Sequence, residues 1–193
     1  MNTKNICKNF KKNGFVVLRD FISKPQLKKI FFQLNQLIDI PLGSINTSQK
    51  KGLTLDEKYL LLKKENPKLK SNFYETITYL DSINSISNSK KITNIVKNIL
   101  KEKTFFVGSS QIRIDHSRDP YYLPQHQELG QMSTKLVLFY MPLVNLNKKT
   151  GGLYIRPKTH ELGFVPFKGY DKEAKAAGHG RQKIIEKLFN KPE

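Results

Sequence analysis

The hydrophobic period of this sequence changes once, near residue 103, and that change limits the possible folds more than any other feature. Before it, apolar residues recur at spacings of three and four, the pattern of helices that pack through one face. After it, runs rich in β-branched and aromatic residues are bounded by Gly, Pro, Asn and Asp; they are TFFVGSSQIRID, KLVLFYMPL and GGLYIRP. The sequence therefore predicts an α+β protein with a helical layer in front of a sandwich or barrel of short strands.

The first interpretable unit is the stretch NGFVVLRDFISKPQLKKIFFQLNQLIDI. Its β-branched and aromatic run at 15–18 predicts a short strand. Ser23 is placed to cap a following helix, with Pro25 in the first turn and Gln26 at the third position of a capping box. The helix would present one apolar stripe to a core. That stripe consists of Leu27, Ile30, Phe31, Leu34 and Ile38.

Helical spacing continues through the first hundred residues. The patterns are Leu55, Tyr59 and Leu62, then Phe73, Ile77 and Leu80, and finally Ile92, Ile95, Val96 and Ile99. The polar stretch DSINSISNSK, at 81–90, predicts a break between the last two patterns. Helices are therefore expected to dominate this part of the chain.

The net charge of +18 invites a nucleic-acid interpretation, because clustered Lys and Arg release counterions from phosphate backbones. Only five of the 34 basic residues are arginine, and the lysines are spread along the chain without interleaved aromatic residues to stack on bases. The excess of Lys, Asn and Ile is typical of AT-rich coding. The pattern therefore argues against a nucleic-acid partner.

The sequence carries no segment typical of export or membrane insertion. Its N-terminus has lysines but neither an apolar core nor a small-residue cleavage site. The longest apolar run, at 136–144, is far shorter than the roughly 20 residues of a membrane span. The single cysteine, Cys7, can form no internal disulfide and suits a reducing compartment. We expect a cytoplasmic protein with Cys7 as a free thiol near a mobile end.

The segment LPQHQELGQM, at 123–132, carries the strongest candidate for chemistry. In an extended chain residues i and i+2 project to the same face, so His126 and Glu128 are expected to point together and Gln127 away from them. An imidazole and a carboxylate are two of the three ligands in the facial triad of non-haem Fe(II) enzymes, which leaves positions open for substrate and oxygen. His-x-Glu also arises by chance, so both residues can equally be ordinary polar residues near a strand end.

Three segments in order resemble the phytanoyl-CoA dioxygenase family of Fe(II)- and 2-oxoglutarate-dependent oxygenases. NGFVVLRDFISKPQLKKI is similar to the family's opening strand and helix, and LPQHQELGQM to its Pro-x-His-x-Asp turn. NKKTGGLYIRPKTHELG is similar to its Asn-Gly-(small)-Leu…Pro-Gly-Ser-His-Lys-x-Gly segment. Three segments spread from residue 13 to 163 are more specific than any one of them. Glu128 departs from the family pattern, which usually has Asp at this position.

The resemblance implies a double-stranded β-helix, the cupin-like jelly roll, behind an N-terminal helical layer. It implies Fe(II) held by His126 and Glu128, and 2-oxoglutarate as a cosubstrate that is decarboxylated to succinate while a small organic substrate is hydroxylated. It also implies binding roles for four residues, with Gln111, Asp115 and Thr134 near the cosubstrate and Arg113 near an acid group. The alternative is that residues 111–115 form an outward polar face on an edge strand.

The family's third iron ligand is a His in a late His-Gly-Ser-like segment, followed about ten residues later by an Arg that pairs with 2-oxoglutarate. His160 and His179 do not match, because Asp171 and Asn190 stand where the Arg is wanted. His160 is instead interpreted as a turn residue that caps its own loop and His179 as an exposed loop residue. His116 is interpreted either as solvated or as a residue that supports a metal ligand without binding the metal.

We therefore expect a single domain over 1–193 that stops before the strands carrying the remaining ligand. Its parts would be a strand and helical layer at 1–102, a β core at 103–167, and a helical or irregular tail at 168–193. Two other classes stay open. One is a non-catalytic basic β-sandwich that binds an acidic partner or nucleic acid, and the other is a cupin-like metal protein with a different reaction.

Overall fold

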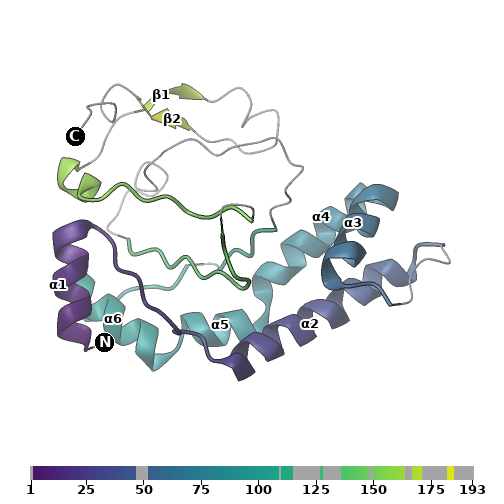
Figure 1. The fold of residues 1–193 in the computed structure, drawn as a ribbon, viewed down its shortest axis with the longest axis horizontal. Coiled ribbons are helices and arrows are strands. Elements are labelled where there is room, and N and C mark those ends of the chain that lie inside the picture. The colour runs from purple at the N-terminus through teal and green to yellow at the C-terminus, as the bar shows by residue number, and fades with distance from the viewer. Residues whose placement is uncertain are drawn as a thin grey trace. The chain divides into compact units, whose positions relative to one another are not determined.

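The computed structural model describes residues 2–46, 52–108, 110–114, 127, 136–147 and 150–163, and the backbone of two strands at 167–170 and 182–184. The helices in Figure 1 are α1 (Thr3–Asn13), α2 (Lys24–Gly43), α3 (Leu55–Glu65), α4 (Pro67–Thr76), α5 (Asp81–Ser87) and α6 (Lys90–Leu100). Short 3-10 helices lie at η1 (Ile77–Tyr79) and η3 (Thr159–Leu162), and the strands are β1 (Phe167–Tyr170) and β2 (Gln182–Ile184).

By its internal contacts the chain divides into two units. A helical unit comprises Leu18–Lys97 and Glu102–Ile114, and therefore holds α2 to α5 and most of α6. The other unit comprises Met1–Val17, Asn98–Lys101 and Asp115–Glu193, and it holds α1, η3 and the two strands. Each unit is described separately below.

Helix α2 begins with the expected capping box. The backbone N–H of Gln26 donates to Ser23 Oγ at 3.4 Å, and the backbone N–H of Ser23 donates to Gln26 Oε1 at 2.9 Å. Two donors that the helix itself leaves unpaired are thereby satisfied. Pro25 lies in the first turn, where its missing N–H costs nothing. The expected stripe is also confirmed, since Ile30, Leu34 and Ile38 are buried and the remaining members, Leu27 and Phe31, are half-buried.

The core of the helical unit forms where helices distant in sequence meet. Helix α2 contacts α3, α4 and α5, and α3 also contacts α4. Four side chains are completely enclosed: Ile30 and Ile38 from α2, Leu62 from α3 and Ile77 from η1. The ring of Tyr59 on α3 packs at 6.3 Å, centroid to centroid, from that of Phe73 on α4. The three apolar patterns after residue 54 are therefore confirmed as buried helix faces, with Leu55 and Ile99 only half-buried.

Polar contacts also join the segments of the helical unit at its surface. Lys58 Nζ on α3 lies 2.8 Å from Asp39 Oδ1 on α2 and donates to Asn35 Oδ1 at 3.3 Å. Lys91 Nζ on α6 lies 3.8 Å from the centroid of the Phe21 ring and donates to the Phe21 carbonyl at 3.3 Å. This second contact combines a cation–π interaction with a hydrogen bond, so it holds the chain that enters α2 against α6.

Helix α3 begins with a second capping box that the sequence interpretation did not include. The Thr54 hydroxyl accepts from the Glu57 backbone N–H at 3.3 Å, and the Glu57 carboxylate accepts from the Thr54 backbone N–H at 2.8 Å and from the Thr54 hydroxyl at 2.7 Å. The two bonds that the carboxylate accepts favour its ionised form, so they lower the pKa of the Glu57 carboxyl below its usual value. The bond from the Thr54 backbone N–H has the larger effect, and the bond from the Thr54 hydroxyl the smaller.

Thr54→Ala is therefore expected to raise the pKa of Glu57 part of the way back, because the hydroxyl donor is lost and the backbone donor remains. Thr54→Ser, which keeps the hydroxyl, should leave that pKa low. A carboxyl whose pKa is depressed by folding stabilises the fold above its unfolded pKa, and this contribution is lost as the pH falls through its folded pKa. A carbon-13 NMR titration of the Glu57 carboxyl measures the shift. An equal pKa in wild type and Thr54→Ala would contradict the assignment.

Two expectations for the first hundred residues are wrong. The stretch at 81–90 breaks the helices only at 88–89, because 81–87 form α5, with Ile83 and Ile86 buried three residues apart. Burial of these two side chains outweighs the weak helix propensity of the Ser and Asn residues around them. The run at 15–18 is an irregular connection and not a strand. A strand requires a partner for its backbone groups, and the described residues provide none here.

In the other unit, α1 is a helix that the sequence interpretation did not anticipate. Its N-cap is Asn2, whose side-chain oxygen accepts from the Lys4 backbone N–H at 3.0 Å. Ile6 is buried, and Cys7 is a half-buried free thiol. Cys7 is therefore unpaired as expected, but it lies within a capped helix and not at a mobile end.

The jelly roll stays a prediction. The described residues of the three β-rich runs, 104–108, 110–114, 136–143 and 151–157, form no strands. Between the last two runs, Gly151 has φ +80°, and the side chains of Thr150 and Asn147 accept from each other's backbone N–H groups at 2.8 and 3.1 Å. The tail differs from expectation, because β1 and β2 pair there as antiparallel strands with Phe167 opposite Ile184.

In the described part of the chain, no helix has both the length and the apolar character to cross a membrane.

Candidate metal site and the residues around it

The two candidate iron ligands, His126 and Glu128, lie outside the residues that the structure describes, as do Asp115 and Thr134. Their roles therefore stay predictions from the sequence. Three related residues are described. Gln127 lies between the two candidate ligands in the sequence, and Gln111 and Arg113 are two of the four residues with predicted binding roles.

Residues 110–114 alternate between the interior and the surface of the helical unit. Ile112 is 8% exposed and belongs to the core, whereas Gln111 and Arg113 are exposed. Ser110 fixes the start of this segment, because its Oγ lies 2.8 Å from that of Ser87 at the end of α5. The burial pattern therefore places Gln111 and Arg113 on one side of the segment, opposite Ile112.

Gln127 connects two of the three segments on which the family resemblance rests. Its side-chain amide Nε2 donates to the backbone carbonyl of Gly163 at 3.0 Å. Gly163 directly follows η3, the turn in RPKTHELG, so LPQHQELGQM and that turn meet at this hydrogen bond. The Gln127 side chain is therefore hydrogen-bonded to the turn that ends at Gly163.

His160 takes part in a junction with the end of α1, and not in a metal site among the described residues. Its Nε2 lies 2.9 Å from the Lys11 carbonyl oxygen, and because a carbonyl only accepts, Nε2 must carry the proton. Next to it, the Lys158 backbone N–H donates to the Asn13 carbonyl at 2.9 Å. His160 was expected to cap its own loop, but it caps a helix 149 residues earlier in the sequence.

Gly14 makes this junction possible. It has φ +81°, the left-handed conformation that ends many helices, and its N–H donates to the Phe10 carbonyl at 2.8 Å. A Cβ at this position would lie 2.5 Å from Nδ1 of the His160 ring, so the ring occupies the space that a side chain would need. The sequence offered a signal for this helix end, since two lysines and then a glycine are typical of a C-terminus.

The described residues contain no group of three His, Cys, Asp or Glu side chains that could hold a metal ion. Three of the four histidines, His116, His126 and His179, lie outside the described residues. Among the histidines, only His160 can therefore be assessed as a third ligand. Its Nε2 is hydrogen-bonded to the Lys11 carbonyl oxygen.

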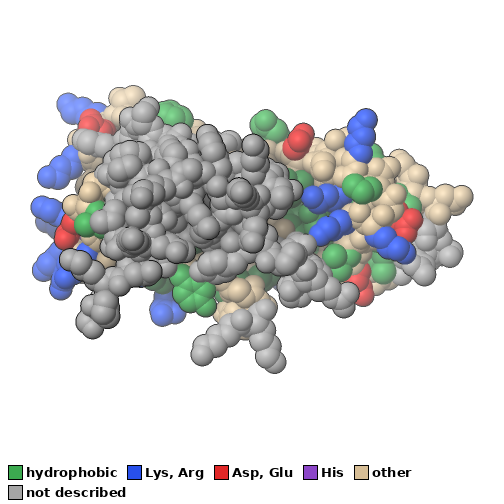
Figure 2. All heavy atoms as spheres, turned by 90° about the horizontal axis from the view of Figure 1, so that it is seen from above, with side chains coloured by type: hydrophobic (Ala, Val, Ile, Leu, Met, Phe, Trp, Pro, Cys, Tyr) green, Lys and Arg blue, Asp and Glu red, His purple; other side chains and the backbone are tan. Residues whose placement is uncertain are grey.

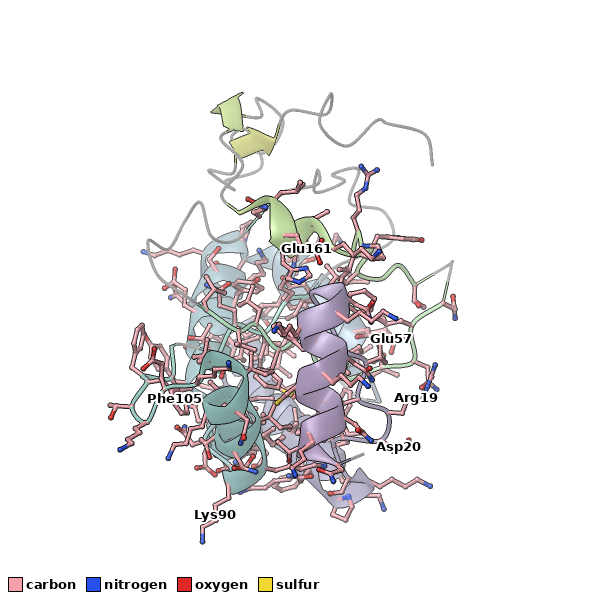
Figure 3. The ribbon with its side chains drawn as sticks, turned by 90° about the vertical axis from the view of Figure 1, so that its left-hand side faces the viewer. Arg19, Asp20, Glu57, Lys90, Phe105 and Glu161 are labelled. Atoms are coloured by element: carbon pink, nitrogen blue, oxygen red, sulfur yellow. The ribbon has the colours of Figure 1, made fainter. Side chains whose placement is uncertain are left out.

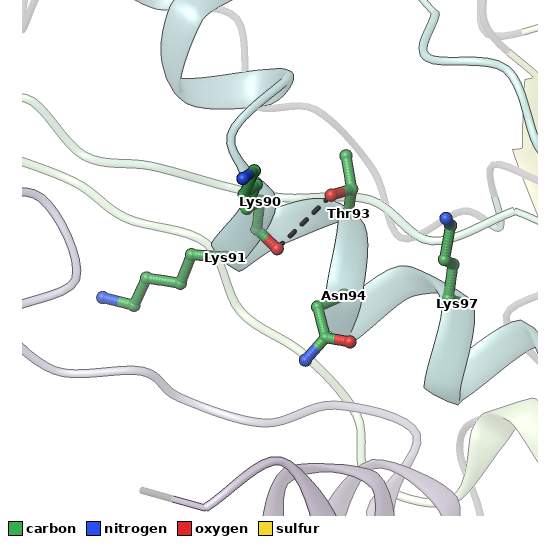
Figure 4. Close-up of a pocket in the computed structure, with 5 residues that line it drawn as sticks. All are labelled: Lys90, Lys91, Thr93, Asn94 and Lys97. Atoms are coloured by element: carbon green, nitrogen blue, oxygen red, sulfur yellow. Dashed lines mark hydrogen bonds between the residues drawn. The ribbon is translucent and has the colours of Figure 1, made fainter.

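A shallow depression lies over α6, lined by Lys90, Lys91, Thr93, Asn94 and Lys97 (Figure 4). All five residues come from this one helix, and the Thr93 hydroxyl donates to the Lys90 carbonyl at 3.3 Å within it. Lys91 is in addition committed to Phe21. The depression is open and makes no enclosed binding site.

Comparison with known proteins adds no assignment. No protein-family model matches the sequence. No curated protein and no solved structure shows a significant match either.

Proposed function

We propose that this chain is an Fe(II)- and 2-oxoglutarate-dependent dioxygenase of the phytanoyl-CoA dioxygenase type that acts on a small organic substrate. The contact that best supports the proposal is the hydrogen bond from Gln127 to Gly163, because it joins two segments that resemble the family in separate parts of the chain. In an extended segment the neighbours of an anchored residue project to the opposite side. His126 and Glu128 would then share the side away from the turn.

The donor set fits Fe(II) in part. A neutral imidazole from His126 and a carboxylate from Glu128 are two ligands of the required kind, and no third is found among the described residues. The exposed Arg113 suits an acid group of the substrate, and Gln111 beside it can donate or accept a hydrogen bond. When bound, Fe(II) with 2-oxoglutarate supplies oxidative decarboxylation and hydroxylation of a C–H bond. A cytoplasmic location, with Cys7 reduced, belongs to the same proposal.

The test is Fe(II)-dependent formation of succinate from 2-oxoglutarate by the full chain. We expect wild type to form succinate only slowly, because the sequence offers two of the three iron ligands, and His126→Ala and Glu128→Ala to fall to the background without protein, because each loses a direct ligand. His179→Ala is the matched control, since it removes a histidine that the sequence does not place at the site, and it should retain turnover. Wild type without turnover, or His126→Ala with full turnover, would contradict the proposal.

Two rival functions predict different results in the same set of measurements. A cupin-like protein with another reaction would bind metal, measured by titration calorimetry with Co(II), without dependence on 2-oxoglutarate. A non-catalytic β-sandwich would form no succinate and bind an acidic partner or nucleic acid in a salt-sensitive manner.

A further inference from the structure

Helix α1 gathers four lysines that look scattered in the sequence. Lys4, Lys8, Lys11 and Lys12 follow the spacing i, i+4, i+7 and i+8, which places them on one face of a helix. All four are exposed, and the other exposed positions of the helix are Asn5 and Asn9. The outer face of α1 therefore consists only of lysine and asparagine. We call these six residues the α1 basic face.

Among the described residues of its own unit, this face has little acidic charge to compensate it. The helix contains no acidic residue, and the described residues provide no ion pair to any of its four lysines. Among the described residues of the same unit, Glu161 is the only acidic side chain, in the turn beyond the C-terminal end of α1 (Figure 3). In the described parts of the face shown in Figure 2, blue Lys and Arg side chains lie at the surface with red acidic side chains beside some of them.

The arrangement opposes the stability of the helix. Lys8 has a like charge three or four residues away on both sides, at Lys4, Lys11 and Lys12, and such pairs destabilise a helix. Lys4 also lies in the first turn, where the helix dipole disfavours a cation, whereas Lys11 and Lys12 lie in the last turn, where it favours them. A polyanion laid along this face would remove both penalties.

We propose that the α1 basic face binds the phosphate backbone of a nucleic acid duplex without sequence preference. Lysine and asparagine side chains are common donors to phosphate oxygens. The face has no exposed aromatic residue to stack on unpaired bases, so it suits a duplex backbone better than a single strand. Its six residues span about 12 Å of helix, which is sufficient to reach several phosphates.

Two other anionic partners fit the face less well. A membrane surface binds helices that offer an exposed apolar face, and the apolar side of α1 is turned inward, with Ile6 only 5% exposed. An acidic protein interface is centred on buried aromatic or aliphatic anchors, and the α1 basic face has none. This surface is independent of the proposed oxygenase activity and can exist with or without it.

The experiment measures binding of the full chain to a fluorescein-labelled 20-base-pair duplex by anisotropy between 50 and 200 mM NaCl. The test variant is Lys4→Gln, Lys8→Gln, Lys11→Gln and Lys12→Gln together. The matched control removes the same charge from exposed positions on three other helices: Lys24→Gln, Lys28→Gln, Lys68→Gln and Lys97→Gln. Circular dichroism of both variants checks that the helices remain folded.

We expect wild type to bind, and the test variant to lose at least about tenfold in affinity, because each lost phosphate contact removes released counterions. The slope of log K against log salt should become shallower by about 3 to 4 in the test variant. The control should lose less than about threefold.

Equal losses in both variants would overturn the proposal, because net charge would then explain the binding. So would wild type that does not bind the duplex. Tighter binding to vesicles with phosphatidylserine, or to polyglutamate, that is lost in the test variant alone would overturn the choice of nucleic acid as the partner.

Discussion

Leu62→Ala is expected to lower the free energy of unfolding of the helical unit by about 2–5 kcal/mol, the cost of deleting a fully buried leucine side chain. Leu62 lies on α3 with no exposed surface, in the core where α3 meets α2 and α4. Its loss removes apolar burial and also leaves a cavity, because packed helices close only partly around a missing side chain. Urea unfolding followed by circular dichroism at 222 nm measures the change, since the described helices are mainly in this unit.

Leu60→Ala is the matched control for this prediction. Leu60 lies two residues earlier on the same helix and is 36% exposed, so the same atoms are removed from a partly solvated position. Its expected cost is below about 1 kcal/mol, because less apolar area leaves water when it folds. Equal costs for the two variants would mean that α3 does not pack on α2 and α4 through Leu62.

Gly14→Ala is expected to destabilise the junction between α1 and the η3 turn by about 2–4 kcal/mol, through two separable effects. The left-handed conformation at φ +81° costs about 1–2 kcal/mol for a residue with a Cβ. The new Cβ would also meet the His160 ring at 2.5 Å, which forces the ring away from the Lys11 carbonyl. Hydrogen exchange of the α1 amides measures the loss, since these amides open with the junction.

Two controls separate the backbone effect from the ring contact. Gly151→Ala introduces a Cβ at φ +80° in the same unit with nothing within 4 Å, so it reports the backbone cost alone. In a His160→Ala background the ring is absent, and the cost of Gly14→Ala should fall toward that of Gly151→Ala. An unchanged cost in that background would show that the His160 ring does not occupy the space beside Gly14.

The helical unit was largely predictable, because its determinants are local or periodic. Ser23 and Gln26 form the expected capping box, and the buried positions of α2 follow the predicted stripe. The errors arise where packing or polar composition overrides a local signal. The helix at 81–87 was missed because Ser and Asn favour turns, although Ile83 and Ile86 are buried beneath them. Helix α1 was missed because it buries little apolar surface, with Ile6 as its buried residue.

The candidate site was predictable only in part, for a different reason. The alternation at 110–114 follows from the sequence, and Gln111 and Arg113 do share a side. The partner of His160 does not follow, because no local pattern encodes a contact across 149 residues. The roles of His126 and Glu128 depend on the direction of two side chains around Gln127, which spacing alone suggests but does not determine.

The junction at the end of α1 has a consequence for the order in which the protein is made. Residues 3–13 leave the ribosome well before Lys158 and His160, which provide the partners of two carbonyl groups at the end of this helix. A helix of 11 residues is marginal on its own in water. Helix α1 is therefore secured only after a segment about 149 residues later in the sequence has been synthesised, so its amides should become protected late during translation.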